Sequence, residues 1–305
     1  MLDEEQLNRR LVNTGVVSRL LRVQEIDSTN AELLRAAKTP DFTTGWPHMA
    51  VLTAEEQTAG RGRLGRGWAS PKSSALSTSI LLRPSLPRTQ WHWLTMTAGL
   101  ALVRTLRGYG VPAALKWPND VHVDGRKIAG LLAAVPSEDP SAVIIGCGIN
   151  VLLTTDQLPT PTSTSVVLEA QRAGHEVPKP GSDQAAGLRT DLLADWLEVF
   201  AQLMHQLQEE GDVESLRADI IAALSTPGED VRVELPGGTA VRGRALRVDE
   251  HGALEVEVTS RRRTVLDPES GGGDQSLWEA GAAVRESFTA GDVVHLRPDT
   301  GGGAS

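Results

Sequence analysis

The pattern of predicted secondary structure changes near residue 226, and this change limits the folds that the chain can adopt. From Val231 onward, short strand-like segments follow one another between glycines, which is typical of a small β-barrel. Before Thr226-Pro227-Gly228, strand patterns alternate with helical ones. A length of 305 residues suits two domains. We therefore predict an α+β domain over 1–226, a β domain over 227–298 and a flexible tail over 299–305.

Apolar spacing in the first domain predicts both helices and strands. The predicted helices lie at 3–12, 28–38 and 89–108, and the predicted strands lie at 21–26, 48–56, 75–82 and 142–151. Thr29 followed by Glu32 forms a capping-box pattern, which places Ser28 and Thr29 at the start of the second helix. Asp124-Gly125 between two strand patterns predicts a two-residue hairpin turn. In the second domain, we expect an irregular insertion near 261–284.

Composition excludes several classes of protein. No apolar run approaches the roughly 18 residues that a membrane-spanning helix needs, and the N-terminal region lacks the apolar core of a secretory signal. The single cysteine, Cys147, cannot form an internal disulfide, which fits a reducing compartment. The net charge of −9 argues against a large nucleic-acid-binding surface. We therefore predict a cytoplasmic protein that binds neither DNA nor membranes.

Glycines and arginines alternate over Gly60–Trp68, in the sequence GRGRLGRGW. The glycines let backbone N–H groups approach a ligand closely, and Arg61, Arg63 and Arg66 supply positive charge. The segment is not a Walker A loop, because no GxxxxGK[ST] occurs in the chain, and no acidic residue completes a Rossmann fingerprint. It predicts either an anion-binding loop of another kind or a solvated Arg/Gly loop.

Two lysines, Lys116 and Lys127, lie on either side of the predicted hairpin. We expect them to face one pocket from adjacent strands, where two cations suit an anion whose charge is shared between a carboxylate and a phosphate. Pro118 and Asn119-Asp120 are also typical of a simple β-corner, so a purely structural interpretation stays open.

The segment GCGIN over 146–150 ends a predicted buried strand with glycines, where a flat ligand could lie against the backbone. Cys147 has no histidine near it in sequence, so we interpret it as a core residue rather than a nucleophile. The histidines never recur at the spacing of metal ligands, so the sequence predicts no metal site.

Four segments occur in a fixed order: Ser28-Thr29-Asn30, EEQTAGRGRLGRGW over 55–68, KWPNDVHVDGRKIAG over 116–130, and GCGIN over 146–150. Together they resemble the bacterial biotin–protein ligases, and the resemblance extends over about 20–225. It implies a catalytic domain related to class II aminoacyl-tRNA synthetases, with a mixed sheet backed by helices, and an SH3-like C-terminal domain. It also favours the monofunctional type, because no DNA-binding domain fits ahead of Ser28.

The resemblance implies roles for residues within these segments. Biotin-binding residues are expected at Ser28, Thr29, Asn30, Gln57, Gly60, Arg61, Gly62, Arg63, Lys127, Gly130, Gly146 and Gly148. Nucleotide-binding residues are expected at Arg63, Arg66, Trp68, Asn119 and Asn150. Catalytic roles are expected for Lys127, Arg63 and Lys116, which would stabilise the reacting phosphate, and for Asp120, which would accept a proton from the attacking amine.

The implied reaction has two steps at one site. The carboxylate of biotin attacks the α-phosphate of ATP, releases pyrophosphate and forms biotinyl-5′-AMP; a lysine of a biotin carboxyl carrier domain then attacks the acyl carbon. Because the carboxylate is already ionised, the first step needs positioning and charge neutralisation, with Mg²⁺ held mainly by the nucleotide. The anhydride must be shielded from water, so we expect loop closure by 60–65 or Thr154–Ser165. A homodimer is compatible with the resemblance.

Two alternatives remain at this point. A lipoate–protein ligase shares the fold and the adenylate chemistry, but the Arg/Gly segment and the glycines of 146–150 favour biotin over the longer lipoyl chain. An RNA-binding protein could use the Arg/Gly segment. The acidic net charge and the lack of an aromatic stacking set around that segment argue against RNA.

Overall fold

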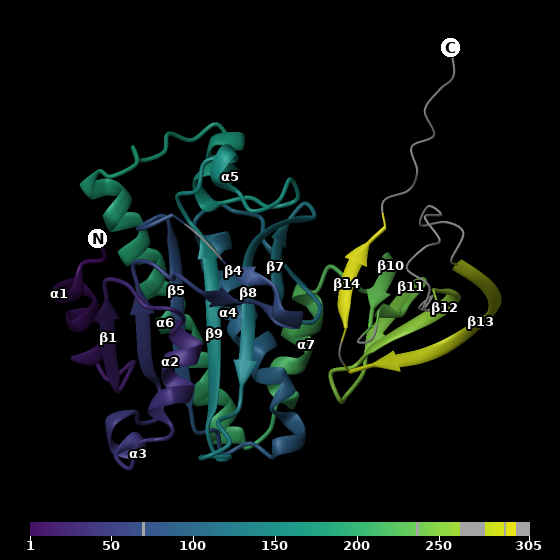
Figure 1. Cartoon of the computed structure of the whole chain (residues 1–305), viewed down its shortest axis with the longest axis horizontal. Helices are drawn as coiled ribbons and strands as arrows, with labels where there is room; N and C mark the ends of the chain where they lie inside the picture. The colour runs from purple at the N-terminus through teal and green to yellow at the C-terminus, as the bar shows by residue number, and fades with distance from the viewer. Residues whose placement is uncertain (69–70, 236–237, 263–277, 290, 297–305) are drawn as a thin grey trace. The chain divides into compact units, whose positions relative to one another are not determined.

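The computed structural model describes residues 1–68, 71–235, 238–262, 278–289 and 291–296 (Figure 1). The chain forms two compact units. The first contains Met1–Leu115 and Asn119–Ala223, and the second contains Lys116–Pro118 and the residues from Leu224 on. Among the described residues, no helix has both the length and the apolar character needed to cross a bilayer.

The first unit is built on a mixed seven-stranded sheet with the order β1-β2-β5-β9-β8-β7-β6. Its strands are β1 (Arg19–Val23), β2 (Ala50–Ala54), β5 (Ala75–Leu82), β6 (Ala114–Lys116), β7 (Asp120–Val123), β8 (Arg126–Ala134) and β9 (Val143–Asn150). Strands β1 and β2 run parallel, whereas β2, β5, β9, β8 and β7 pair antiparallel in that order. The fully buried central strand β5 carries short polar side chains as well as apolar ones, which becomes important at the site.

Helices cover both faces of this sheet (Figure 1). They are α1 (Glu4–Leu7), α2 (Thr29–Ala36), α3 (Phe42–Gly45), α4 (His92–Gly108), α5 (Val166–Arg172), α6 (Asp183–Glu210) and α7 (Glu214–Ala223). On one face, Leu33 of α2 and Phe42 of α3 pack with Leu52, Leu81 and Ile144 of the sheet. Helices α4 and α6 pack together and are joined where the indole of Trp196 donates to the carbonyl of Ala98.

The second unit contains a five-stranded antiparallel sheet with the order β13-β12-β11-β10-β14. The strands are β10 (Asp230–Glu234), β11 (Ala240–Val248), β12 (Leu254–Arg262), β13 (Trp278–Phe288) and β14 (Asp292–His295). The tripeptide Lys116–Pro118 belongs to this unit although its neighbours in sequence do not. Trp117 is 1% exposed, and its backbone and indole N–H groups donate to Thr226 and to the carbonyl of Gly252.

Local sequence signals predicted the turns and caps well, with one correction. The hairpin prediction is confirmed: β7 and β8 are joined at Asp124-Gly125, both with positive φ, 47° and 75°. Ser28, rather than Thr29, is the N-cap of α2, and its hydroxyl accepts from the N–H of Ala31. Thr29 is the first helical residue, so its side chain is available to other partners. The strand predicted at 21–26 starts two residues earlier and ends at Val23.

The prediction of an irregular segment over 261–284 was wrong at its flanks. Residues 261–262 end β12 and 278–284 belong to β13, while 263–277 lie outside the described residues. Strand β13 is exposed along most of its length, so its sequence shows no alternation of apolar and polar residues. The predicted tail over 299–305 also lies outside the described residues.

We expect Gly187→Ala to stabilise the first unit by about 0.5–1 kcal/mol, because glycine in a helix costs about that much relative to alanine. Gly187 lies inside α6, and apart from the helix's own backbone a Cβ there would meet no atom of the described residues within 4 Å. Gly211→Ala is the matched control, since Gly211 ends the same helix with a φ of 73° and should lose about 1 kcal/mol. Urea unfolding of both variants measures the two changes, and stabilisation by both would contradict the conformational explanation.

Candidate active site

Small residues form a row that crosses the sheet on the face that carries α2. Strand register places Ala54 opposite Ser77, Ser77 opposite Gly148, and Gly148 opposite Gly130. Asp120 faces Gly130 at the end of the row. Residues that are directly opposite in neighbouring strands point to the same side, so these residues together make a flat floor. The sequence predicted the two glycines but not Ala54 and Ser77, because strand order and register are not visible in a linear motif.

One end of the floor is bounded by a hydrogen-bonded cluster at the start of α2. The carbonyl oxygen of the Gln57 side chain accepts from the backbone N–H and the hydroxyl of Thr29, at 2.8 and 3.1 Å. Ser79 of β5 donates to Thr29 and to Asn30, and Asn30 also donates to the carbonyl of Leu132. The structure thus brings three predicted biotin-binding residues together, and it adds Ser79, which only the strand register places beside them.

Asn30 also explains why Gly146 is glycine. A Cβ at Gly146 would lie 2.7 Å from Cγ and Nδ2 of Asn30 and closer still to its Oδ1. Asn30 is held by its bonds to Ser79 and Leu132, so it cannot move aside without breaking them. Gly146 therefore lets Asn30 pack directly against the backbone of β9.

The Arg/Gly segment forms a short ribbon rather than an open coil. Strand β3 (Gly60–Arg61) pairs antiparallel with β4 (Gly67–Trp68), around a 3-10 turn at Arg63–Gly65. A Cβ at Gly148 would lie 2.7 Å from Nε1 of Trp68, so the indole covers the floor. That Nε1 is buried and has no hydrogen-bond partner within the described part of the chain. A buried donor above a bare backbone surface is a feature that a bound acceptor would satisfy.

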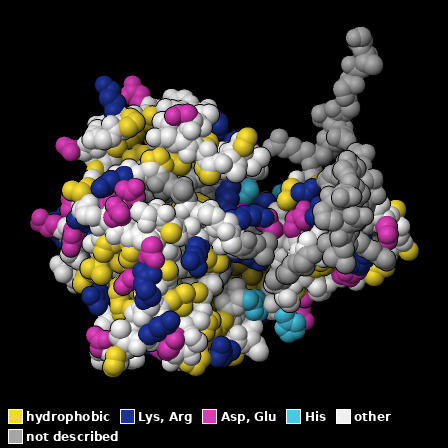
Figure 2. All heavy atoms as spheres, viewed as in Figure 1, with side chains coloured by type: hydrophobic (Ala, Val, Ile, Leu, Met, Phe, Trp, Pro, Cys, Tyr) yellow, Lys and Arg dark blue, Asp and Glu magenta, His cyan; other side chains and the backbone are white. Residues whose placement is uncertain are grey.

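Arg63 connects the ribbon to the hairpin region. Its Nη1 donates to Oδ1 of Asn119 at 3.1 Å, and Asn119 in turn donates to the carbonyl of Leu131 at 2.6 Å. The exposed Arg61 and Arg66 lie on the same ribbon. On the face drawn in Figure 2, basic and acidic side chains of the described residues are interspersed, without the continuous basic stripe that a nucleic-acid surface requires.

The far end of the floor carries an ion pair. Nζ of Lys127 lies 2.6 Å from Oδ1 of Asp120, and a Cβ at Gly130 would be 3.0 Å from that Nζ. Nε2 of His122, which the sequence analysis passed over, lies 3.7 Å from Oδ2 of Asp120. Burial alone would raise the pKa of Asp120, but His122 and Lys127 outweigh it and hold that pKa at about 2. Asp120 is therefore ionised at neutral pH.

A second segment is attached to the backbone of Lys127. The N–H of Lys127 donates to the carbonyl of Thr162, and the carbonyl of Lys127 accepts from the N–H of Thr164, both at 2.8 Å. Asn150 donates to the carbonyl of Thr164 at 3.0 Å. The predicted closing loop Thr154–Ser165 is thus fixed at its C-terminal end to the strand that carries the lysine.

The structure corrects the prediction for Lys116 and confirms the one for Cys147. Lys116 ends β6 and falls in the second unit, and β7 lies between β6 and β8 in the sheet, so Lys116 and Lys127 are not on adjacent strands. Cys147 is buried in β9, and burial raises the pKa of its thiol, as expected for a core cysteine. Among the residues that the structure describes, no group of three or more His, Cys, Asp or Glu side chains could hold a metal ion.

Comparison with known proteins assigns the chain to a family. The model of the biotin/lipoate A/B protein ligase family matches residues 22–150, the range that contains the floor, the ribbon and the hairpin. The chain is 36% identical over 303 residues to the biotin–[acetyl-CoA-carboxylase] ligase of Mycobacterium tuberculosis, covering 97% of this chain and 96% of that protein. The chain belongs to the biotin–protein ligase family.

More distant members of the biotin–protein ligase family agree. The bifunctional ligase/repressor BirA of Bacillus spizizenii is 33% identical over 216 residues, covering 69% of this chain and 62% of that protein. The biotin protein ligase from Aquifex aeolicus in complex with biotin and ATP has the same fold, with a TM-score of 0.65 at 22% identity. That alignment covers 92% of this chain and 99% of the Aquifex chain, so the mixed sheet with helices and the C-terminal antiparallel sheet are both shared.

We expect Asp120→Asn to lower the free energy of unfolding at pH 7 by on the order of 2 kcal/mol, because the pKa of Asp120 in the folded chain, about 2, lies below its ordinary value of 3.8. A carboxyl whose pKa is lowered by folding stabilises the fold above its unfolded pKa, and this contribution is lost as the pH falls through about 2. The difference between parent and variant should therefore be constant from pH 7 to 5 and about halved at pH 3. Urea unfolding at several pH values measures it, and a difference that grows on acidification would contradict the pairing.

Proposed function

We propose that this chain activates biotin with ATP to biotinyl-5′-AMP and transfers the biotinyl group to a lysine of a biotin carboxyl carrier domain. The observation that carries the proposal is the floor of small residues, bounded by the Thr29–Gln57 cluster at one end and by Lys127–Asp120 at the other. This floor has the shape needed to bind a flat ring system whose carboxylate reacts with a phosphate. The 36% identity to a biotin–[acetyl-CoA-carboxylase] ligase over nearly the whole chain supports the same reaction.

At the first end of the floor, Ser28, Thr29, Asn30 and Gln57 would hydrogen-bond the ring system of biotin. Their side chains are pre-positioned, because each is already bonded to a cap, to a strand or to another member of the cluster. Gly146 and Gly148 would contribute to the biotin site by letting Asn30 and Trp68 pack close to the backbone of β9. The ribbon with Gly60, Arg61 and Gly62 would close over it, and this closure protects the mixed anhydride from water.

At the other end, Lys127 and Arg63 would neutralise the charge that the carboxylate and the α-phosphate share in the transition state. An ammonium and a guanidinium fixed in place cost no reorganisation during the reaction, which is the source of their effect. Arg66, Trp68, Asn119 and Asn150 would bind the nucleotide, and the buried Nε1 of Trp68 is a donor with no acceptor among the described residues. A Mg²⁺ ion would be held mainly by the phosphates, since the nucleotide supplies its oxygen ligands.

The geometry favours a role for Asp120 in orienting Lys127 over a role as the proton acceptor in the transfer step. A carboxylate with a pKa of about 2 is a weak base, whereas the attacking lysine amine must lose a proton near neutral pH. A contact of 2.6 Å to Nζ instead holds the ammonium above the end of the floor. Lys116 remains a proposed contributor.

Finer features of the fold and of the assembly follow from the family. The first unit would be related to class II aminoacyl-tRNA synthetases, and the five-stranded sheet of the second unit would be SH3-like. A cytoplasmic location and a homodimer are part of the same proposal. Transfer to the carrier domain of a biotin-dependent carboxylase is supported by the Mycobacterium tuberculosis relative, which is a biotin–[acetyl-CoA-carboxylase] ligase.

Lipoate is the second candidate substrate, because the matching family model covers lipoate ligases as well as biotin ligases. One experiment separates the two. Carrier domain, ATP and Mg²⁺ are incubated with this protein and either biotin or lipoate, and the carrier is weighed by mass spectrometry. A gain of one biotinyl group with biotin alone is the expected result. A lipoyl gain would replace the proposed substrate, and no gain with either acid would contradict the proposed reaction.

A further inference from the structure

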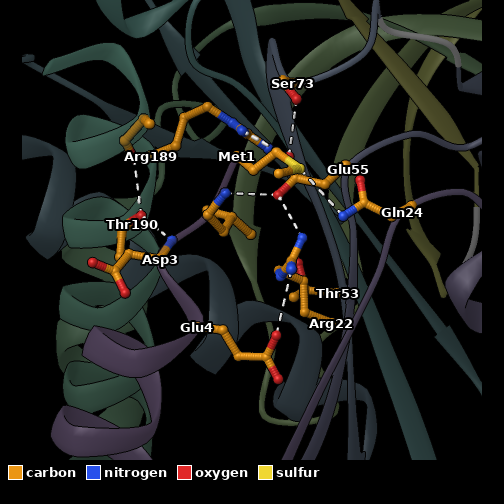
Figure 3. Close-up of polar contacts among 12 residues, drawn as sticks. Met1, Asp3, Glu4, Arg22, Gln24, Thr53, Glu55, Ser73, Arg189 and Thr190 are labelled. Carbon is orange, nitrogen blue, oxygen red and sulfur yellow. Dashed lines mark hydrogen bonds and ion pairs between the residues drawn. The ribbon is translucent and has the colours of Figure 1, made fainter. Parts of the chain in front are cut away.

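The segment that carries the Arg/Gly ribbon leaves the sheet after β2 and returns to it at β5, and its two ends meet at one buried ion pair. Glu55 follows β2 directly, and its carboxylate lies 2.9 Å from Nη1 of Arg189, which projects from α6 (Figure 3). The two side chains are 0% and 1% exposed. Neither residue belongs to the clusters along the floor, and Arg189 lies about forty positions beyond the last motif in the sequence.

Each partner of the pair also bonds to the returning end of the segment. The carboxylate of Glu55 accepts from the hydroxyl of Ser73 at 3.1 Å, and the backbone carbonyl of Glu55 accepts from the backbone N–H of Ser73 at 3.0 Å. Nε and Nη2 of Arg189 donate to the carbonyl of Ala75, at 3.2 and 3.0 Å. Strand β2 ends at Ala54, opposite Ser77, so β2 offers no ladder partner to that carbonyl. The guanidinium of Arg189 therefore supplies the hydrogen-bond donors that a neighbouring strand would otherwise give to this carbonyl.

Further contacts hold the pair from the other side. The N–H of Leu2 donates to Oε1 of Glu55 at 2.7 Å, and Arg22 of β1 approaches the same oxygen at 3.5 Å (Figure 3). Burial alone would raise the pKa of Glu55, but Arg189 and these donors lower it below its usual range, so the carboxylate stays charged. Ser73 has a φ of 56°, a conformation that is unfavourable for a residue with a side chain and that its two bonds to Glu55 maintain.

Stability alone does not account for this arrangement. Helix α6 is already held by fully buried apolar side chains, among them Leu193, Trp196 and Phe200. A buried ion pair contributes little net stability compared with apolar residues of similar size, because both charges must be removed from water. The pair instead fixes relative positions, because the planar guanidinium of Arg189 bonds to the carboxylate of Glu55 and to the carbonyl of Ala75 at the same time.

We infer that Glu55 and Arg189 are positioning residues that hold the two ends of segment 56–74 together, so that the ribbon can close over a ligand from a fixed base. Gln57 lies two residues beyond Glu55, and its side chain accepts both hydrogen bonds from Thr29. The position of Glu55 therefore also influences where Gln57 lies at the end of the floor. The expected effect of the Glu55–Arg189 pair on catalysis rests on the proposed adenylation function. The expected effect of the pair on the ligand-free protein does not depend on that function.

The test uses the full chain and two variants. Arg189→Lys keeps the charge but loses the fork, and Glu55→Gln with Arg189→Met removes both charges without leaving one of them buried alone. Arg83→Lys is the matched control, because Arg83 follows the other end of β5 and likewise joins a carboxylate, Asp139, to a carbonyl, that of Trp46. Urea unfolding first establishes that each variant is folded and by how much its stability changes.

The ligand-free readout is cleavage by trypsin at the exposed Arg61 and Arg66 of the ribbon, followed by mass spectrometry. We expect at least about fivefold faster cleavage there in both pair variants and parental cleavage in Arg83→Lys, since only the pair variants release the base of the segment. Equal rates in all proteins would overturn the inference. So would a failure of both pair variants to fold, because the pair would then be a stability element.

The catalytic readout is pyrophosphate release with biotin and ATP. For the pair variants we expect the KM for biotin to rise about tenfold or more, with kcat within about threefold of the parent, since positioning is lost while the charged groups remain. A fall in kcat with an unchanged KM would contradict a positioning role. If the parent protein releases no pyrophosphate, the proposed function fails, and the trypsin result still decides the inference.

Discussion

Lys127→Ala is expected to lower the rate of pyrophosphate release by about a hundredfold or more, the loss typical of removing one preorganised electrostatic group. The side chain leaves β8 two residues after the rigid Asp124-Gly125 turn, and Asp120 holds its ammonium at the end of the floor. In the proposed mechanism the charge acts mainly as carboxylate and phosphate come together, so kcat should fall more than substrate binding. Timed assays at saturating biotin and ATP measure the rate of pyrophosphate release, and circular dichroism tests whether the variant is folded.

Two companion variants make the Lys127 result specific. Lys179→Ala removes an exposed lysine outside every cluster and should leave the rate unchanged. Lys127→Arg should restore the rate only in part, because the guanidinium is larger and planar where a compact charge is required. A folded Lys127→Ala protein within threefold of the parent rate would contradict the proposed role of Lys127 and direct attention to Lys116.

Gly146→Ala is expected to raise the KM for biotin by about ten- to a hundredfold, because overpacking of a rigid site costs about 1–3 kcal/mol. The new methyl group would overlap Asn30, whose amide is fixed by Ser79 and Leu132. Displacing Asn30 shifts the start of α2 and with it the bonds between Thr29 and Gln57. Initial rates over a range of biotin concentrations separate this effect from any change in kcat.

The Gly187→Ala variant is the matched control for this substitution, since it adds the same methyl group where no described atom outside the helix's own backbone lies within 4 Å. Its KM for biotin should equal that of the parent. A Gly146→Ala protein with a parental KM would contradict the proposed role of Asn30 in setting the biotin site.

Much of the fold could be predicted because its signals are local. The turn at Asp124-Gly125, the strand over 75–82 and the start of α2 near Ser28 depend on residues that are neighbours in sequence. Strand β13 was missed because it is exposed on most of its length and carries no apolar alternation. The order of the strands was not predictable, because it depends on pairings between residues that are distant in sequence.

The residues of the candidate site likewise divide into those that the sequence could predict and those that it could not. Residues inside compact motifs, such as Gln57 and Lys127, could be singled out from the sequence. Ser77 and Ser79 could not, since only strand register shows that they share a face with the glycines of β9. Arg189 gave no signal at all, because an arginine in a long amphipathic helix is normally a solvated residue. Its partner in space is 134 positions away in the chain.

The tripeptide Lys116–Pro118 has a consequence for how such a chain can be cut or recombined. Trp117, 1% exposed, takes its hydrogen-bond acceptors from Thr226 and Gly252, so its burial depends on residues at the other end of the sequence. A truncation after residue 226 would remove Gly252 and leave a large indole facing water, directly before Asn119 and Asp120. The two units therefore cannot be exchanged independently: a graft between relatives must move Lys116–Pro118 together with the residues from Leu224 on.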